Sequence, residues 1–252
     1  GEYTQLTAGE GHTCAITLDG DVECWGQNNL GQSFSQEGDF IYIDAGRTHT
    51  CGIESDGSIL CWSEDQSFQL NRNATTETFL SVSAGYANTC GIKTDGSYTC
   101  WGADLTYANH LANFVPSASL LDLVVLERAY NPETGRYEDN WYPYAPCACS
   151  IDTLGKIECW GAFRDLVTDG AFESIRDNVP SDTSTSSEFI QIEAGSFHVC
   201  ALDATGTAHC WGYSGPTPSG AHNFSSIAVG YLHNCGLRNN GELICWGDNS
   251  YN

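Results

Sequence analysis

The sequence predicts an all-β fold, a β-propeller of six blades, on three observations. A pattern of fifteen residues recurs six times within the 252 residues of the chain. In each copy, alternation with the two-residue period of β-strands brackets a turn. Three of the five spacings between successive copies fall between 35 and 39 residues, about the length of one propeller blade. A propeller of seven blades, or an incomplete ring, is the alternative.

The six copies share two cysteines ten positions apart, a glycine between them and a tryptophan directly after the second cysteine. They are HTCAITLDGDVECWG (12–26), HTCGIESDGSILCWS (49–63), NTCGIKTDGSYTCWG (88–102), CACSIDTLGKIECWG (147–161), HVCALDATGTAHCWG (198–212) and HNCGLRNNGELICWG (233–247).

Each copy is expected to fold as a β-hairpin. In the first copy, a three-residue loop at 18–20 with Gly20 in the left-handed conformation joins the two strands. That loop sets Ile16 opposite Val22 and Cys14 opposite Cys24, with the two cysteine Cα atoms about 4.5 Å apart. This separation lies at the short end of the disulfide range.

The pairing predicts one disulfide in every hairpin, each contributing about 2–3 kcal/mol through the unfolded state. Zinc sites and free thiols are the alternatives, and zinc fits poorly because each hairpin offers only two directly opposed cysteines. The expected pairs are Cys14–Cys24, Cys51–Cys61, Cys90–Cys100, Cys149–Cys159, Cys200–Cys210 and Cys235–Cys245.

A further strand is expected before five of the hairpins, ending in a small residue and a glycine. These strands lie at 3–9, 40–46, 79–85, 189–195 and 224–230. The residue after each first cysteine is small, as Ala15 and Gly52 illustrate, which suits close stacking of blades. We expect Trp25 to cover the space beside Ala15.

The whole chain, residues 1–252, is expected to form a single propeller domain. Its repeats span approximately 1–37, 38–77, 78–115, 116–175 with an insertion, 176–222 and 223–252.

The run AGEGHTCAITLDGDVECWGQNNLGQ (8–32) resembles the regulator-of-chromosome-condensation repeat in its secreted bacterial form. The resemblance covers nearly the whole chain, although the fourth copy is degraded. It implies a β-propeller, most often of seven blades. Its extracellular members include propellers on plant crinkly-type receptor kinases and a secreted bacterial inhibitor of β-lactamase.

The charge of the chain opposes the chromatin binding that the family name suggests. Nine Lys and Arg residues face 32 Asp and Glu residues, for a formal net charge of −23, and such a field repels nucleic acid. Six hairpin disulfides would also be reduced in a nucleus. No stretch reaches the roughly 18–20 apolar residues that span a bilayer, so we expect no membrane insertion.

The main departure from the repeat is an aromatic insertion before the fourth copy. Rigid scaffolds often bind partners through loops rich in Tyr and Trp, so this insertion is the predicted partner-binding site. Packing of these rings over the blades as a lid is the alternative. The residues are Tyr130, Tyr137, Trp141, Tyr142 and Tyr144.

Cys147 makes the cysteine count odd, so it is expected to be unpaired or to form an intermolecular disulfide. Four histidines recur two residues before a first cysteine: His12, His49, His198 and His233. A metal ring is conceivable there, but structural hydrogen bonding is the favoured interpretation.

Two sequons, at Asn73 and Asn223, predict N-glycosylation if the source glycosylates secreted proteins. No cofactor or metal site is predicted, although acidic loops leave weak calcium binding open.

The chain carries no catalytic motif of the hydrolase, zincin or phosphate-loop kinds. We therefore expect a secreted or cell-surface, acidic, non-catalytic module that binds a protein or a glycan, or that builds an extracellular assembly. Two alternatives remain: an inhibitor of an extracellular enzyme, and an extracellular hydrolase or lyase that uses carboxylates of a central channel.

Overall fold

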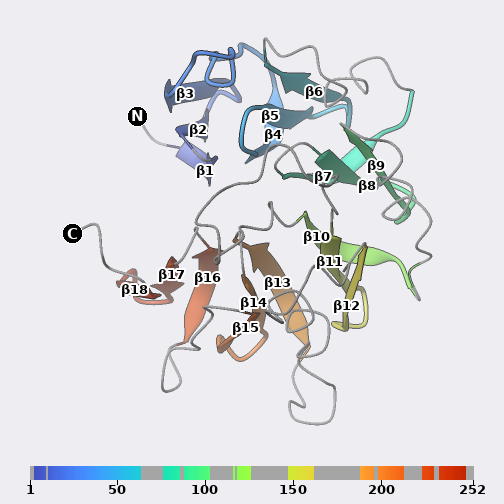
Figure 1. The fold of residues 1–252 in the computed structure, drawn as a ribbon, viewed down its shortest axis with the longest axis vertical. Helices are drawn as coiled ribbons and strands as arrows, with labels where there is room; N and C mark the ends of the chain where they lie inside the picture. The colour runs from blue at the N-terminus through green and yellow to red at the C-terminus, as the bar shows by residue number, and fades with distance from the viewer. Residues whose placement is uncertain are drawn as a thin grey trace, which may run out of the picture. The chain divides into compact units, whose positions relative to one another are not determined.

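The computed structural model describes residues 3–9, 11–63, 76–85, 88–102, 116, 118–125, 147–161, 188–195, 198–212, 223–229 and 233–247. Within these residues the chain forms eighteen β-strands and no helix, so no helix of the described part is long and apolar enough to cross a membrane. The strands make six three-stranded antiparallel sheets, each from three consecutive strands (Figure 1). By its contacts the chain divides into two compact units, Gly1–Ala112 and Asn113–Asn252.

The first unit holds the sheets β1-β2-β3, β4-β5-β6 and β7-β8-β9. Their strands are β1 (Tyr3–Ala8), β2 (His12–Thr17), β3 (Val22–Gly26), β4 (Phe40–Ala45), β5 (Thr50–Glu54), β6 (Ile59–Trp62), β7 (Phe79–Ala84), β8 (Asn88–Lys93) and β9 (Tyr98–Gly102).

The second unit holds the sheets β10-β11-β12, β13-β14-β15 and β16-β17-β18. Their strands are β10 (Leu120–Val125), β11 (Cys147–Asp152), β12 (Ile157–Gly161), β13 (Phe189–Ala194), β14 (His198–Asp203), β15 (Ala208–Gly212), β16 (Phe224–Val229), β17 (His233–Arg238) and β18 (Leu243–Gly247).

The predicted hairpin register is confirmed in all six sheets. In the first, Ile16 pairs with Val22 and Cys14 with Cys24. All six predicted disulfides form, with Cα atoms 4.0–4.1 Å apart. The turn glycines have φ between 73° and 89°, as the three-residue loop requires.

Neighbouring sheets pack through a contact that recurs four times, twice in each unit. The disulfide of one sheet lies in a hydrophobic cluster with the phenylalanine and the tryptophan of the following sheet. Cys14, for example, packs with Phe40 and Trp62. The same cluster forms around the disulfides that contain Cys51, Cys149 and Cys200. Each disulfide therefore contributes to the core as well as to the hairpin.

The expectation that Trp25 covers the space beside Ala15 stays a prediction. Trp25 pairs with Thr13 and remains 47% exposed. In other sheets the small residue instead makes room for the phenylalanine of its own first strand. A Cβ added at Gly52 would lie 2.6 Å from the Phe40 ring, which is closer than real Cβ contacts come.

A backbone hydrogen bond also joins neighbouring sheets at the tight turn. The phenylalanine N–H that begins a sheet donates to the turn-glycine carbonyl of the sheet before it. The four bonds are Phe40 to Gly20, Phe79 to Gly57, Phe189 to Gly155 and Phe224 to Gly206, at 2.9–3.2 Å. This contact places each turn directly against the next blade.

Alanine at two turn glycines should separate backbone strain from crowding. Gly57 and Gly241 have nearly the same φ, +84° and +83°. A Cβ at Gly57 would lie 2.8 Å from the Cβ of Thr78, whereas no described atom lies within 4 Å of the Cβ position at Gly241. Gly241→Ala should lower the free energy of unfolding by about 1–2 kcal/mol, the strain of a left-handed residue.

Gly57→Ala should lower the free energy of unfolding by clearly more than Gly241→Ala does, because Thr78 must also move. Urea denaturation of the two variants measures the difference. Equal losses would mean that the turn does not press against the next sheet.

Candidate functional site

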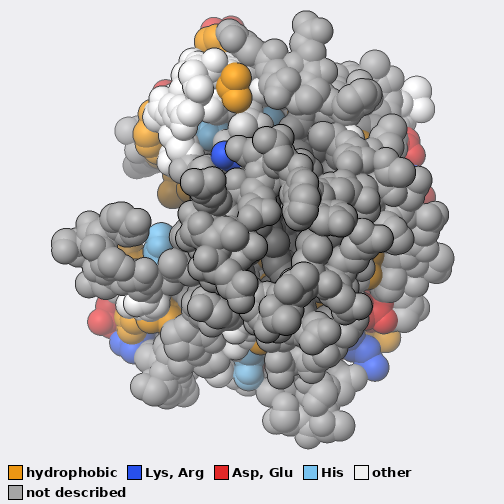
Figure 2. All heavy atoms as spheres, in the orientation of Figure 1, with side chains coloured by type: hydrophobic (Ala, Val, Ile, Leu, Met, Phe, Trp, Pro, Cys, Tyr) orange, Lys and Arg blue, Asp and Glu red, His pale blue; other side chains and the backbone are white. Residues whose placement is uncertain are grey.

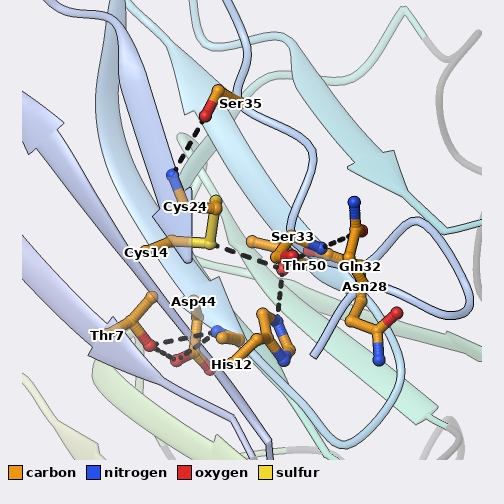
Figure 3. The surroundings of a disulfide bond; sticks show 11 residues. Thr7, His12, Cys14, Cys24, Asn28, Gln32, Ser33, Ser35, Asp44 and Thr50 are labelled. Atoms are coloured by element: carbon orange, nitrogen blue, oxygen red, sulfur yellow. Dashed lines mark hydrogen bonds between the residues drawn. A yellow bond between two sulfur atoms is a disulfide. The ribbon is translucent and has the colours of Figure 1, made fainter. Parts of the chain in front are cut away.

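The recurring spacing of histidine and cysteine builds a buried hydrogen bond between neighbouring sheets. His12 Nε2 and Thr50 Oγ1 lie 2.8 Å apart, and Thr50 Oγ1 donates to the carbonyl of Gln32 at 2.9 Å (Figure 3). Because a hydroxyl has one proton, Thr50 must accept from His12, whose Nε2 therefore carries the hydrogen. The same hydroxyl lies 3.9 Å from Cys14 Sγ.

The contact repeats in both units. His49 Nε2 lies 2.8 Å from Thr89 Oγ1, and His198 Nε2 lies 2.6 Å from the side-chain amide of Asn234. All three imidazoles are buried. The structural interpretation of these histidines is thus confirmed for His12, His49 and His198. Within the described residues, no group of three or more His, Cys, Asp or Glu side chains lies together as a metal site.

Burial keeps these imidazoles neutral. Desolvation lowers the pKa of His12 and of His198, and it lowers the pKa of His49 from 6.5 to about 4, with a smaller contribution from the nearby charge of His12. The Nδ1 atom of each ring is buried and has no hydrogen-bond partner among the described residues. A ring protonated on both nitrogens would be a buried charge whose Nδ1–H has no partner.

A half-buried carboxylate joins three first strands of the first unit. Asp44 on β4 accepts a hydrogen bond from Thr7 Oγ1 on β1 at 2.9 Å (Figure 3). It accepts another from Ala84 N on β7 at 2.8 Å. It also accepts one from Ala45 N at 3.0 Å. Burial raises the pKa of Asp44, although these hydrogen bonds oppose the rise. No pattern in the sequence distinguishes this group, because it is one of 32 acidic residues.

Four exposed aliphatic side chains recur where the first strand of a sheet bulges. The register shifts at this point, as between Phe40 and Tyr42, and leaves the residue between them out of the pairing. We call these four the bulge residues, and each is 49–57% exposed: Ile41, Leu80, Leu121 and Ile190. An apolar side chain kept in water at the same place in four sheets is a candidate contact for a partner.

The bulge residues lie at the same end of their sheets as the acidic tight turns. Asp39, two residues before Ile41, accepts a hydrogen bond through its carbonyl from Ser55 N in the turn of its own sheet. Those turns carry acidic residues such as Asp19, Asp56 and Asp95. The surface at this end therefore combines aliphatic side chains with negative charge.

The sequence-predicted site residues are only partly within the described structure. The aromatic insertion (Tyr130, Tyr137, Trp141, Tyr142 and Tyr144) and Asn73 lie outside the described residues, so these assignments stay predictions. Cys147 begins β11, where its backbone pairs with Gly161. Asn223 is exposed and has a φ of +51° directly before β16, and its glycosylation also stays a prediction.

Several solved structures share this fold. The ectodomain of the Physcomitrella patens receptor kinase CR4 matches 99% of the chain, with 18% identity and a TM-score of 0.72. The CRINKLY WD40 ectodomain of the Arabidopsis thaliana receptor kinase ACR4 matches 100% of it, with 20% identity and a TM-score of 0.67. Prp20p from Saccharomyces cerevisiae matches 96% of it, with 14% identity and a TM-score of 0.68. The fold is a β-propeller of six blades with one disulfide in each.

Part of the chain matches a known repeat family. Residues 3–32, 189–215 and 224–252 match the family profile of the Regulator of chromosome condensation (RCC1) repeat. None of the curated proteins matches the sequence. The chain spans 65% of the CR4 ectodomain, 83% of the ACR4 ectodomain and 71% of the Prp20p chain.

The buried histidines should make the fold sensitive to acid. The folded pKa of His49, about 4, lies below its unfolded value of 6.5, so between these values the unfolded chain binds the proton more readily. The free energy of unfolding should therefore fall as pH decreases from 6.5 to 4, by about 3 kcal/mol for this imidazole. Denaturation curves across that range measure the loss.

In His49→Gln, the fall in the free energy of unfolding between pH 6.5 and pH 4 should be smaller by about 3 kcal/mol, because an amide does not titrate. Because the pKa of Asp44 is raised in the fold, its protonation makes the free energy of unfolding rise as pH falls. This contribution is the same in the variant and in the unmodified chain, so it cancels when the two are compared. Thr89→Ala removes the hydrogen-bond partner and keeps the imidazole, so it should lower stability without flattening the curve. An unchanged slope in His49→Gln would contradict the assignment.

Proposed function

We propose that this chain is an extracellular, non-catalytic binding module that recognises a protein or a glycan, or that serves as a building block of an extracellular assembly. The observation that carries the proposal is the disulfide in every blade. Each joins directly opposed cysteines of one hairpin, and four of them lie in the hydrophobic clusters between sheets. Disulfides of this kind form and persist in oxidising compartments.

The comparisons support an extracellular setting without fixing a partner. Two of the similar structures are ectodomains of plant receptor kinases. Their identity to this chain, 18–20%, supports the fold alone, since one fold serves many functions. The formal charge of −23 favours a partner with basic groups over nucleic acid or an anionic surface.

Asp44 supports a role without catalysis. This half-buried carboxylate joins three strands of the first unit, and it accepts three hydrogen bonds, from Thr7, Ala45 and Ala84. A carboxylate held in this way is a structural group. An enzyme that uses channel carboxylates, or an inhibitor of an extracellular enzyme, is the rival proposal.

Peptide mapping without reduction tests the compartment. Protein isolated from its native source, with free thiols blocked at lysis, should yield the Cys14–Cys24 peptide and its five counterparts. The expected state follows from the oxidising environment that we propose. Predominantly free thiols at these twelve positions would overturn the extracellular assignment.

Paired substitutions should locate the partner surface. Immobilised chain is used to capture partners from the extracellular fluid of the source organism. Trp141→Ala with Tyr142→Ala should abolish the capture and leave the melting temperature unchanged, because we place the contact in the aromatic insertion.

Ile41→Ser with Leu80→Ser is the matched comparison at the bulge residues. Loss of capture in this variant alone would move the partner surface to the bulge residues. A lower melting temperature with capture intact, in the first variant, would assign the aromatic insertion to packing. Capture that survives in both variants would contradict both surfaces.

A further inference from the structure

The tight turns and the starts of the first strands form one continuous row along the ends of the three sheets in the first unit. Each turn-glycine carbonyl accepts a hydrogen bond from the first strand of the next sheet, and the residue before that strand accepts one from the turn of its own sheet. The four bonds, 2.8–3.0 Å long, are Phe40 N to Gly20, Ser55 N to Asp39, Phe79 N to Gly57 and Thr94 N to Thr78. We call residues 18–20, 39–41, 55–57, 78–80 and 94–96 the turn row.

The turn row is acidic. Its exposed carboxylates are Asp19, Asp39, Asp56 and Asp95. The ion pairs between described residues involve none of these four. Hydrogen bonds from Ser58 and Ser97 lower the pKa of Asp56 and of Asp95, so both side chains are ionised at neutral pH. Figure 2 shows acidic side chains at the surface of the first unit, along the top and the right of the view.

The turn row also carries two bulge residues, Ile41 and Leu80, each 57% exposed. Ile41 belongs to the middle sheet of the first unit, and both sheets that pack against this sheet are in the same unit. In the second unit, Ile190 has the same position on the middle sheet and is 49% exposed. Exposure of the bulge residue therefore follows from how each sheet is packed within its own unit.

The corresponding row of the second unit has the aliphatic side chains without the charge. Its bulge residues are Leu121 and Ile190. At the turn centres and directly before the first strands, this row has Ser119, Leu154, Glu188, Thr205, Asn223 and Asn240. One of these six residues is acidic, whereas four of the five residues at such positions in the turn row are acidic. Aliphatic side chains and negative charge therefore occur together in the first unit only.

We propose that the turn row binds a basic segment of a partner protein. Apolar side chains of the segment pack on Ile41 and Leu80, and its Lys or Arg side chains lie beside the carboxylates of the row. This proposal rests on the proposed function, because it takes the module to bind a protein, and it adds a contact separate from the aromatic insertion.

The chemistry of the row selects this occupant. A nucleic acid, an anionic membrane or an acidic glycan would place negative groups against four carboxylates. A neutral glycan offers no aliphatic side chain to the two bulge residues. A protein segment with both basic and apolar side chains complements both features. Packed sheets lie about 10 Å apart and an extended chain advances about 3.3 Å per residue, so a short segment reaches both bulge residues.

Peptide binding to the full chain tests the turn row. The probe is a fluorescein-labelled peptide in which lysines flank two leucines, and its fluorescence anisotropy is measured as the protein concentration is raised. One control peptide has serine in place of each leucine. A second control peptide has glutamate in place of each lysine.

The aliphatic contact is tested by Ile41→Thr with Leu80→Thr. This variant copies Thr4, which leaves the strand pairing at the same place in the first sheet. Leu121→Thr with Ile190→Thr makes the same change in the second unit and is the matched control. All four positions are exposed, so the melting temperature should stay unchanged in both variants.

The charge is tested by Asp56→Asn with Asp95→Asn. This variant copies Asn240, whose side chain accepts a hydrogen bond from Glu242 N at 3.0 Å in the turn of the sixth sheet. Asp56 and Asp95 accept the equivalent bonds, at 2.8 and 2.9 Å, so asparagine keeps these turns and removes only their charge.

The lysine–leucine peptide should bind the unmodified chain and the second-unit control with the same Kd. Loss of the two aliphatic side chains should raise the Kd about tenfold, since apolar contact area is lost. The two asparagine substitutions should raise it roughly threefold to tenfold, because each exposed charge contributes little. Both control peptides should bind about tenfold more weakly or worse.

Three results would overturn the proposal. The first is a lysine–leucine peptide that does not bind the unmodified chain. The second is equal binding of the serine peptide, or an unchanged Kd in the Ile41 and Leu80 variant, since charge alone would then explain the binding. The third is an equal loss in the second-unit control. The aromatic insertion is intact in every variant, so the proposed function is decided separately, by peptide mapping and partner capture.

Discussion

The packing of a hairpin disulfide under the phenylalanine and tryptophan of the following sheet is the contact on which the rest of the structure depends. A three-stranded sheet has two faces and cannot bury both alone. Here the disulfide supplies the flat, apolar centre of one face, as Cys51 and Cys61 do beneath Phe79 and Trp101. The same disulfide therefore closes its hairpin covalently and helps to bury the phenylalanine and the tryptophan of the following sheet.

This packing explains the polar features around it. Trp62 of the second sheet packs on the disulfide of the first sheet. This packing places the start of the second hairpin beside the histidine of the first, so that Thr50 forms a hydrogen bond with His12. The site is too dry for an imidazolium, and the neutral ring becomes a hydrogen-bond donor between blades. The same approach brings the turn carbonyl of Gly20 to the N–H of Phe40.

The sequence predicted the hairpins well and the contacts between sheets poorly. The cysteine spacing and the loop glycine determine register within a hairpin, so Cys14–Cys24 and Ile16–Val22 could be placed. The packing of Trp62 against Cys14 could not be placed, because it depends on which sheets are neighbours in space. The sequence pattern did not predict strand β10. It begins with Leu120 where most first strands begin with phenylalanine, and no glycine follows it, although its apolar residues have the spacing of the other first strands. The link through Asp44 joins three strands that are distant in sequence, and no local pattern indicates it.

The contacts between sheets also determine which positions of the repeat can vary with function. The turn glycines are constrained by their contact with the next sheet, and the residue after each first cysteine is constrained by the aromatic residue of its own sheet, whatever the protein binds. The bulge residue has no such constraint, since it leaves the ladder and points to solvent, as Ile41 and Ile190 do. A repeat protein of this kind can therefore change its partner at the bulges and in the insertions while every blade keeps the same core. For this reason the fold follows from the repeated residues, whereas the partner must be sought in the residues that do not repeat.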